Sequence, residues 1–170
     1  VERYGADVVR WHLYTVNAPG EPKRFDEEDL KKVSRRFFNI IYNSFVFYDT
    51  YACHADAFEG DSSHVLDRWV LARLDETNVR VAELLDAYDI GGAARMIEQF
   101  VDDVSRWYIR RSRARFQRPT SQDDHAAASW TLEHVLSELS LLMAPFAPFF
   151  SESVFQSFGN DVSLHCGDWP

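Results

Sequence analysis

Residues 66–116 read LDRWVLARLDETNVRVAELLDAYDIGGAARMIEQFVDDVSRWYIRRSRARF, and this stretch decides the fold. Apolar side chains recur in both halves at spacings of three and four, the period of an amphipathic helix. The turn signal YDIGG separates the halves, and Asp89 is suited to cap the second one. The pattern therefore predicts helices over 67–88 and 92–116. Their expected core residues are Val70, Leu74, Val81, Leu84 and Tyr88, then Ile97, Phe100, Val101, Val104 and Tyr108.

The helical period continues on both sides of this hairpin. A helix capped by Asp26 is expected to bury Leu30, Val33, Phe37, Ile41, Phe45 and Tyr48, and a helix over 123–143 to bury Leu132, Val135, Leu136, Leu139 and Leu142. A last helix fits FFSESVFQSF, and the tail DVSLHCGDWP predicts one short strand. Four long amphipathic helices with short loops indicate an all-α, antiparallel helix bundle.

The N-terminal segment differs from the bundle. A short helix fits GADVVRWHLYT, and the following stretch VNAPGEPKRF, with Pro19, Gly20 and Pro22, breaks the helical pattern. We therefore expect residues 1–24 to form a helical appendage with a linker, and residues 25–170 to form the bundle. The first residues lack a Met and read as entering partway through an element, so we expect a segment of a longer protein.

Composition restricts the class of protein. The 170 residues are 46% hydrophobic, as in a globular domain, and no apolar run is long enough for a membrane span. The two cysteines lie far apart, which is typical of reduced thiols in a cytoplasmic protein. An alternative is a metal site built from Cys53–His54 and His165–Cys166, although adjacent ligands are not the usual zinc spacing.

Positive charge gathers in one segment of an otherwise acidic chain. The net charge is −9, yet six arginines and no acid lie between residues 105 and 118, next to aromatic side chains. At about 100° per residue, Arg106, Arg110 and Arg113 fall opposite the core stripe of their helix, whereas Arg111 and Arg115 continue the stripe. Two interpretations stay open: a solvated face paired with nearby acids, or a surface for the phosphates of a nucleic acid.

Motifs for catalysis are absent from the sequence. It has no GxGxxG or GxxxxGK[ST] loop for phosphates, and its histidines are scattered singly. Acidic pairs such as those in FDEED and QDDH stand at helix starts, where capping explains them. We therefore expect no catalytic residue, no metal ligand and no cofactor in this chain.

Specific strings resemble a known family. VERYGADVVRWHLYTVNAPGEPKRFDEEDLKK is similar to the segment after the Lys-Met-Ser-Lys-Ser loop of class I aminoacyl-tRNA synthetases, and FFNIIYNSFVFYDTY to the first helix of their anticodon-binding bundle. The arginine-rich SRWYIRRSRARF resembles the isoleucyl-tRNA synthetases in particular, as do LSLLMAPFAPFFSESVFQSF and DVSLHCGDWP. The resemblance covers nearly the whole chain.

The resemblance implies a division of labour within a longer enzyme. The parent would ligate isoleucine to tRNA(Ile) with ATP in the cytoplasm, and its catalytic and editing domains would lie outside this chain. The family's zinc-binding region would lie beyond Pro170. Residues 1–24 would end the stem-contact fold, and the bundle would hold the anticodon stem and loop. We expect a monomer that contacts no membrane.

The resemblance also implies which residues contact tRNA. Arg106, Arg110 and Arg113 are expected on the RNA backbone, and Arg111 and Arg115 either touch RNA or brace the end of the bundle. A second candidate surface consists of Arg35, Arg36, Asn39 and Asn43. Trp107 is expected to pack rather than to stack on a base. The alternatives are the same domain of a valyl- or methionyl-tRNA synthetase, and a helical module that binds an acidic protein.

Overall fold

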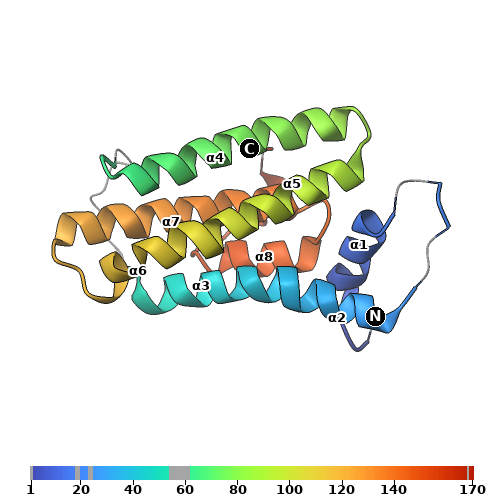
Figure 1. Cartoon of the computed structure of the whole chain (residues 1–170), viewed down its shortest axis with the longest axis horizontal. Helices are drawn as coiled ribbons and strands as arrows, with labels where there is room; N and C mark the ends of the chain where they lie inside the picture. Colours follow the sequence, from blue (N-terminus) through green and yellow to red (C-terminus); the bar gives the residue numbers. More distant parts are fainter. Residues whose placement is uncertain (1, 18–19, 23–24, 54–61, 168) are drawn as a thin grey trace.

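The computed structural model describes residues 2–17, 20–22, 25–53, 62–167 and 169–170, and these residues form an all-helical bundle (Figure 1). Helix α1 spans Ala6–Thr15. A continuous helical rod follows, made of α2 (Glu27–Val33), the π-helical turn η1 (Ser34–Phe38) and α3 (Asn39–Tyr51). The hairpin consists of α4 (Val65–Asp86) and a second rod, made of α5 (Ile90–Asp102), the π-helical segment η2 (Asp103–Ile109) and α6 (Arg110–Gln117). The chain closes with α7 (Gln122–Met143), α8 (Pro148–Gln156) and the 3₁₀ turn η3 (Leu164–Cys166).

The first bundle helix and α5 begin at the capping residues that the sequence predicts, Asp26 and Asp89. The Asp26 carboxylate accepts a hydrogen bond from the Glu28 N–H at 2.9 Å, and the Asp89 carboxylate accepts one from the Gly92 N–H at 2.8 Å. Each bond satisfies a backbone donor that has no partner inside its helix. These caps confirm the predicted start of the first bundle helix and set the start of α5.

The core lies between the long helices, which run side by side in Figure 1. All the predicted core residues of α5, η2 and α7 are buried, and so are Val70, Leu74 and Val81 of α4. In the first rod Val33 and Phe45 are only half-buried. The predicted apolar stripes are therefore confirmed along most of their length, because each helix faces the bundle axis with one side.

Tyr88 is a correction to the predicted core. Its side chain is 85% exposed, because α4 ends at Asp86 and Tyr88 has a left-handed backbone with φ 59°. The Tyr88 N–H donates to the Leu85 carbonyl and the Asp89 N–H donates to the Leu84 carbonyl. This pair of bonds closes a Schellman motif, which turns the chain away from the core before Tyr88 can reach it.

The predicted C-terminal strand is also wrong. No strand occurs among the residues that the structure describes, and Leu164–Cys166 form a 3₁₀ turn instead. A lone strand would leave its backbone groups unpaired. Here the Glu152 carboxylate accepts from the Leu164 N–H at 3.1 Å and from the Ser163 hydroxyl at 3.0 Å, while the Leu164 side chain is buried.

Helix α1 packs on the same core as the bundle. The Trp11 side chain is fully buried, and its ring stacks on Phe37 with 3.9 Å between centroids. Asp7 accepts a hydrogen bond from the Phe150 N–H at 2.6 Å, which caps α8, a helix whose own N-cap residue Ala147 supplies no side-chain bond. The division of the chain at residue 24 stays a prediction.

Candidate nucleic-acid interface

The π-helical segment η2 rotates the arginine-rich end of the second rod. A π-turn holds an extra residue, so every side chain beyond it is displaced by roughly 100° from a straight helical wheel. The buried residues accordingly move from the line of Val104 and Tyr108 to Ile109, Ser112 and Phe116. The phase shift carries Arg111 away from the core stripe that the straight wheel predicts for it, and Arg111 is exposed.

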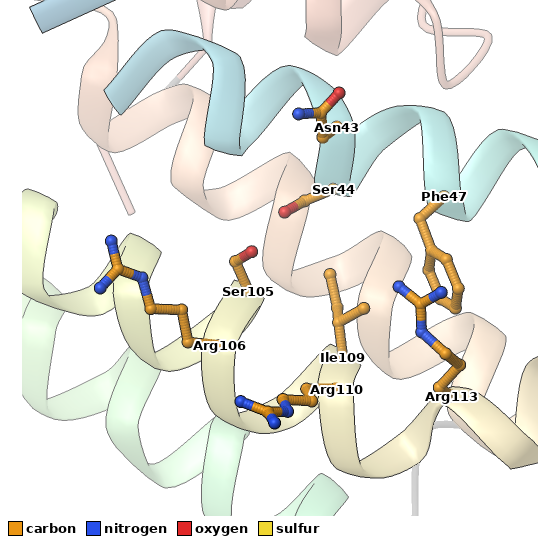
Figure 2. Close-up of a pocket in the computed structure, with 8 residues that line it drawn as sticks. All are labelled: Asn43, Ser44, Phe47, Ser105, Arg106, Ile109, Arg110 and Arg113. Carbon is orange, nitrogen blue, oxygen red and sulfur yellow. The ribbon is translucent and has the colours of Figure 1, made fainter. Parts of the chain in front are cut away.

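The same rotation turns the predicted arginine face toward α3. A hollow of about 580 Å³ lies between α3 and the η2–α6 segment (Figure 2). Phe47 and Ile109 supply its apolar lining, and Figure 2 shows Ser44 and Ser105 pointing toward one another across it. It is lined by Asn43, Ser44, Phe47, Ser105, Arg106, Ile109, Arg110 and Arg113.

A second hollow, of about 600 Å³, adjoins the first at Arg106, which lines both. It is lined by Lys32, Val33, Arg36, Phe37, Glu98, Asp102 and Arg106. We call the two hollows together the groove. The groove brings Arg36 and Asn43, two residues of the second candidate surface, into one site with the arginines of the η2–α6 segment, which we call the arginine helix. Arg35 and Asn39 are exposed on the same rod and line neither hollow.

The charge in the groove is uneven along its length. Arg106 pairs with Asp102, with 3.1 Å between Nε and Oδ1, whereas no described carboxylate pairs with Arg110 or Arg113. The Arg113 guanidinium instead lies over the Phe47 ring, 5.2 Å from its centroid. The end of the groove near Phe47 therefore offers cationic donors without competing acids, beside an apolar surface.

Arg115 has the bracing role rather than an exposed one. Its guanidinium binds Asp67 through two bonds, Nη1–Oδ1 at 2.6 Å and Nη2–Oδ2 at 2.8 Å, and its Nη2 lies 2.7 Å from Asp124 Oδ1. The side chains of Arg115 and Asp67 are 10% and 0% exposed. Arg115 thus joins the end of α6 to the beginnings of α4 and α7, and the carboxylates occupy its donors.

Two hydroxyls complete the network around Asp67. Tyr108 donates to Asp67 Oδ1 at 2.8 Å and Ser62 donates to Oδ2 at 2.7 Å. Burial alone would raise the pKa of the Asp67 carboxyl, but the hydrogen bonds, led by those from Arg115, outweigh burial and lower it. Burial would lower the pKa of Arg115, and its two carboxylate partners raise it instead. Both groups are therefore held in their charged forms.

Arg111 lies on the other flank of α6, outside the groove. Its guanidinium stacks on the Trp107 ring, 3.7 Å from the centroid, and Trp107 is 45% exposed. Trp107 also packs against Trp69 of α4, with 6.3 Å between centroids. Asp103 pairs with Arg73 rather than with an arginine of its own segment.

Sequence reasoning missed several groove residues. Ser44, Phe47, Ser105, Ile109 and Lys32 line the groove but were not among the predicted site residues. Phe47 could have been identified from the sequence, because its spacing from Arg36 and Asn43 places the three residues on one helical face. Ile109 could not be identified from the sequence, because only the π-turn brings its side chain to the groove.

The described residues do not form a metal site. No three of their histidines, cysteines and acids converge in a way that could hold an ion. His54, a member of the alternative metal set, lies outside the described residues. None of the helices in the described part of the chain has the length and apolar character needed to cross a membrane.

Comparison with known proteins relates the chain to a group of enzymes. A family model described as the anticodon-binding domain of tRNA ligase matches residues 67–170. An isoleucine–tRNA ligase of Clostridium acetobutylicum is 39% identical over 182 aligned residues, which cover 100% of this chain and 18% of the relative. An isoleucine–tRNA ligase of Deinococcus radiodurans is 38% identical over 175 residues, with 99% and 16% covered. The chain thus spans less than a fifth of the length of these relatives.

Solved structures share the fold at low sequence identity. The methionyl-tRNA synthetase of Mycobacterium tuberculosis, in its free state, has a TM-score of 0.73 and 19% identity, covering 94% of this chain and 34% of that chain. A LeuRS of Agrobacterium radiobacter K84, in a ternary complex with tRNA and LeuAMS, has a TM-score of 0.68 and 19% identity, covering 100% of this chain and 20% of that chain. At this identity, the likeness shows the helical architecture alone.

Proposed function

This chain belongs to the family of anticodon-binding domains of tRNA ligases, and from that premise we propose that its groove holds the anticodon stem and loop of an isoleucine tRNA. The longer protein then ligates isoleucine to this tRNA with ATP, in the cytoplasm, with catalytic and editing domains supplied by other parts of the same polypeptide. Any zinc of the longer protein is bound outside this chain. The chain acts as a monomer and contributes binding, not catalysis.

One observation carries the proposal. One groove is lined by two surfaces that lie far apart in the sequence, namely the arginine helix and the face that carries Arg36 and Asn43. The arginines Arg110 and Arg113 of this groove have no carboxylate partner among the described residues. An acidic protein has a reason to keep such charges unpaired when its ligand is a polyanion. The planar guanidinium groups match phosphate oxygens in paired hydrogen bonds.

The groove also has the composition of a site for a single-stranded loop. Phe47 and Ile109 offer apolar surface, while the Asn43 amide and the Ser44 and Ser105 hydroxyls both donate and accept hydrogen bonds. Unpaired RNA bases bind through their faces and their hydrogen-bonding edges. Phosphate contacts then supply affinity, and the polar lining supplies any discrimination between tRNAs. Arg35 and Asn39 extend the proposed footprint along the α3 rod.

The test is a salt titration of tRNA binding with Arg106, Arg110 and Arg113 replaced together by Ala. For three lost phosphate contacts, the slope of log K against log salt should fall in magnitude by roughly two to three units, at about 0.7 to 0.9 per phosphate. Arg80→Ala is the control, because Arg80 already pairs with Glu83 on α4. An unchanged slope in a folded triple variant would mean that these arginines form only a solvated face.

Two alternatives predict other outcomes of the same titration. A domain of a valyl- or methionyl-tRNA synthetase would bind valine or methionine tRNA more tightly than isoleucine tRNA. A module for an acidic protein would bind none of the three with a salt slope that depends on the arginines. The preference for isoleucine rests on the 37–39% identity to relatives with that name.

A further inference from the structure

A cationic side chain outside the groove lies on the flank of the η2–α6 segment toward α4. Arg110 and Arg111 are consecutive, so they project about 100° apart around the helix. Arg110 lines the groove, whereas Arg111 stacks on Trp107, which in turn packs against Trp69 of α4. We call this arrangement the Trp107–Arg111 stack. It is not part of the groove, and both side chains are exposed.

The stack fixes the guanidinium without using its hydrogen-bond donors. With the Arg111 Cζ 3.7 Å from the Trp107 ring centroid, the indole covers one face of the guanidinium. Its N–H groups lie in the plane of the guanidinium, and none of them donates to a described residue. An arginine held in this way loses less side-chain entropy on binding and keeps its full fork of donors.

The acids on this flank pair with another cation rather than with Arg111. Asp103 lies one helical turn before Trp107, and it pairs with Arg73 at 3.1 Å. Arg73 also pairs with Glu76. Asp103 and Glu76 therefore share one cation of α4, and neither carboxylate pairs with Arg111.

We propose that the Trp107–Arg111 stack is a second phosphate-binding site, so that bound RNA reaches across the outer edge of α6 from the groove to the α4 side. The inference rests on the proposed function, because the ligand is the same RNA. Continuity favours a nucleic acid over an acidic protein, since Arg110 and Arg111 are adjacent on a helix that already borders the groove. A polyphosphate backbone can satisfy both flanks with one repeating group.

The experiment compares Arg111→Gln with Arg111→Lys and with the triple Ala variant, in salt titrations with an unmodified isoleucine tRNA transcript. Arg111→Gln should reduce the magnitude of the salt slope by about 0.7 to 0.9 and weaken binding by roughly tenfold at moderate salt. Arg111→Lys should preserve the slope but lose affinity, because Lys keeps the charge without the planar fork. Arg80→Gln, about 17 Å along α4 from Trp69, is the control and should leave the slope unchanged.

Two substitutions of Trp107 test the role of its ring. Trp107→Leu should weaken binding by roughly two- to fivefold with an unchanged slope, because the charge stays and its support is lost. Trp107→Phe keeps an aromatic face and should recover most of this loss. If Trp107→Leu matches the original chain in affinity while remaining folded, the stack plays no part. Thermal melts of each variant check folding.

The outcomes separate this inference from the proposed function. A lower slope in the triple variant with an unchanged slope for Arg111→Gln would confine the RNA to the groove and overturn the second site. Unchanged slopes in both would overturn the proposed function itself. Lower slopes in both, with the Trp107 series behaving as stated, support the two sites together.

Discussion

Asp67 is the most deeply buried carboxylate among the residues that the structure describes. It is fully buried, and it accepts hydrogen bonds from Arg115, Tyr108 and Ser62. A buried ion pair gains little over a well-packed apolar pair, yet removing one partner leaves an unpaired charge in the interior. The network therefore makes the junction of α4, α6 and α7 sensitive to single substitutions.

Asp67→Asn should destabilise the chain by about 1 to 3 kcal/mol at neutral pH, because Arg115 loses its buried counter-charge and keeps only the pairing with Asp124. Urea unfolding followed by far-UV circular dichroism measures the difference. Asp75→Asn is the matched control, since Asp75 is an exposed carboxylate on the same helix and should change stability by less than about 0.5 kcal/mol. Equal effects of the two variants would contradict a special role for Asp67.

The difference in unfolding free energy between the original chain and Asp67→Asn should also depend on pH. The pKa of Asp67 is lowered in the folded chain, so its contribution is fully present above the unfolded pKa of about 3.9 and is lost as pH falls through the folded pKa. Asp67→Asn should therefore lose less stability between neutral pH and acid than the original chain does. A stability difference between the two proteins that stays constant as pH falls through the folded pKa of Asp67 would contradict a lowered pKa for this carboxyl.

The second rod, made of α5, η2 and α6, shows at the scale of one element what a sequence can and cannot predict. The pattern predicts the helix and its inner stripe from Ile97 to Tyr108, because local spacing determines both. It does not predict the orientation of residues beyond Tyr108. A straight wheel assigns Arg111 and Arg115 the same role, whereas one is exposed on Trp107 and the other is buried on Asp67. A π-turn depends on packing against α3 and α4, which periodicity does not encode.

The end of α4 offers a test of backbone strain. Tyr88 adopts φ 59°, where a side chain clashes with the backbone at a cost of about 1 to 2 kcal/mol. Tyr88→Gly should raise stability by about 0.5 to 1 kcal/mol, because Gly removes this clash but gains more freedom when unfolded. A thermal melt should show a rise of about 1 to 4 °C.

Tyr88→Ala separates the backbone from the side chain in this test. Ala removes the same exposed ring but keeps the Cβ that causes the clash, so its melting temperature should not rise. A gain in Tyr88→Ala equal to that in Tyr88→Gly would mean that the exposed ring, rather than the left-handed backbone, limits stability at this turn.

At the scale of the whole molecule, the candidate site depends on contacts between distant segments. The sequence identifies the arginine cluster and, separately, the Arg36–Asn43 face, but their meeting in one groove follows only from the packing of α3 against η2. Likewise, Asp7 appears in the sequence as a residue near a helix start, and the structure assigns it to the cap of α8. Helices are predictable from local spacing, whereas their neighbours are determined by burial over the whole chain.

Helix α7 tests whether the bundle behaves as one cooperative unit. Leu136 is 1% exposed and belongs to the continuous core that joins α7 to the other long helices. Leu136→Asp places a carboxylate without a counter-charge among apolar side chains, a cost of several kcal/mol against a typical total stability of about 5 to 15 kcal/mol. We expect this variant to be unfolded, or to melt at least about 10 °C lower, when followed by far-UV circular dichroism.

Two control variants accompany Leu136→Asp. Leu136→Met nearly conserves volume and should cost less than about 1.5 kcal/mol. Ser137→Asp adds the same charge at the next, half-buried position. A Leu136→Asp variant that melts like the original chain would mean that the inner face of α7 is misplaced, and with it the packing that supports the groove.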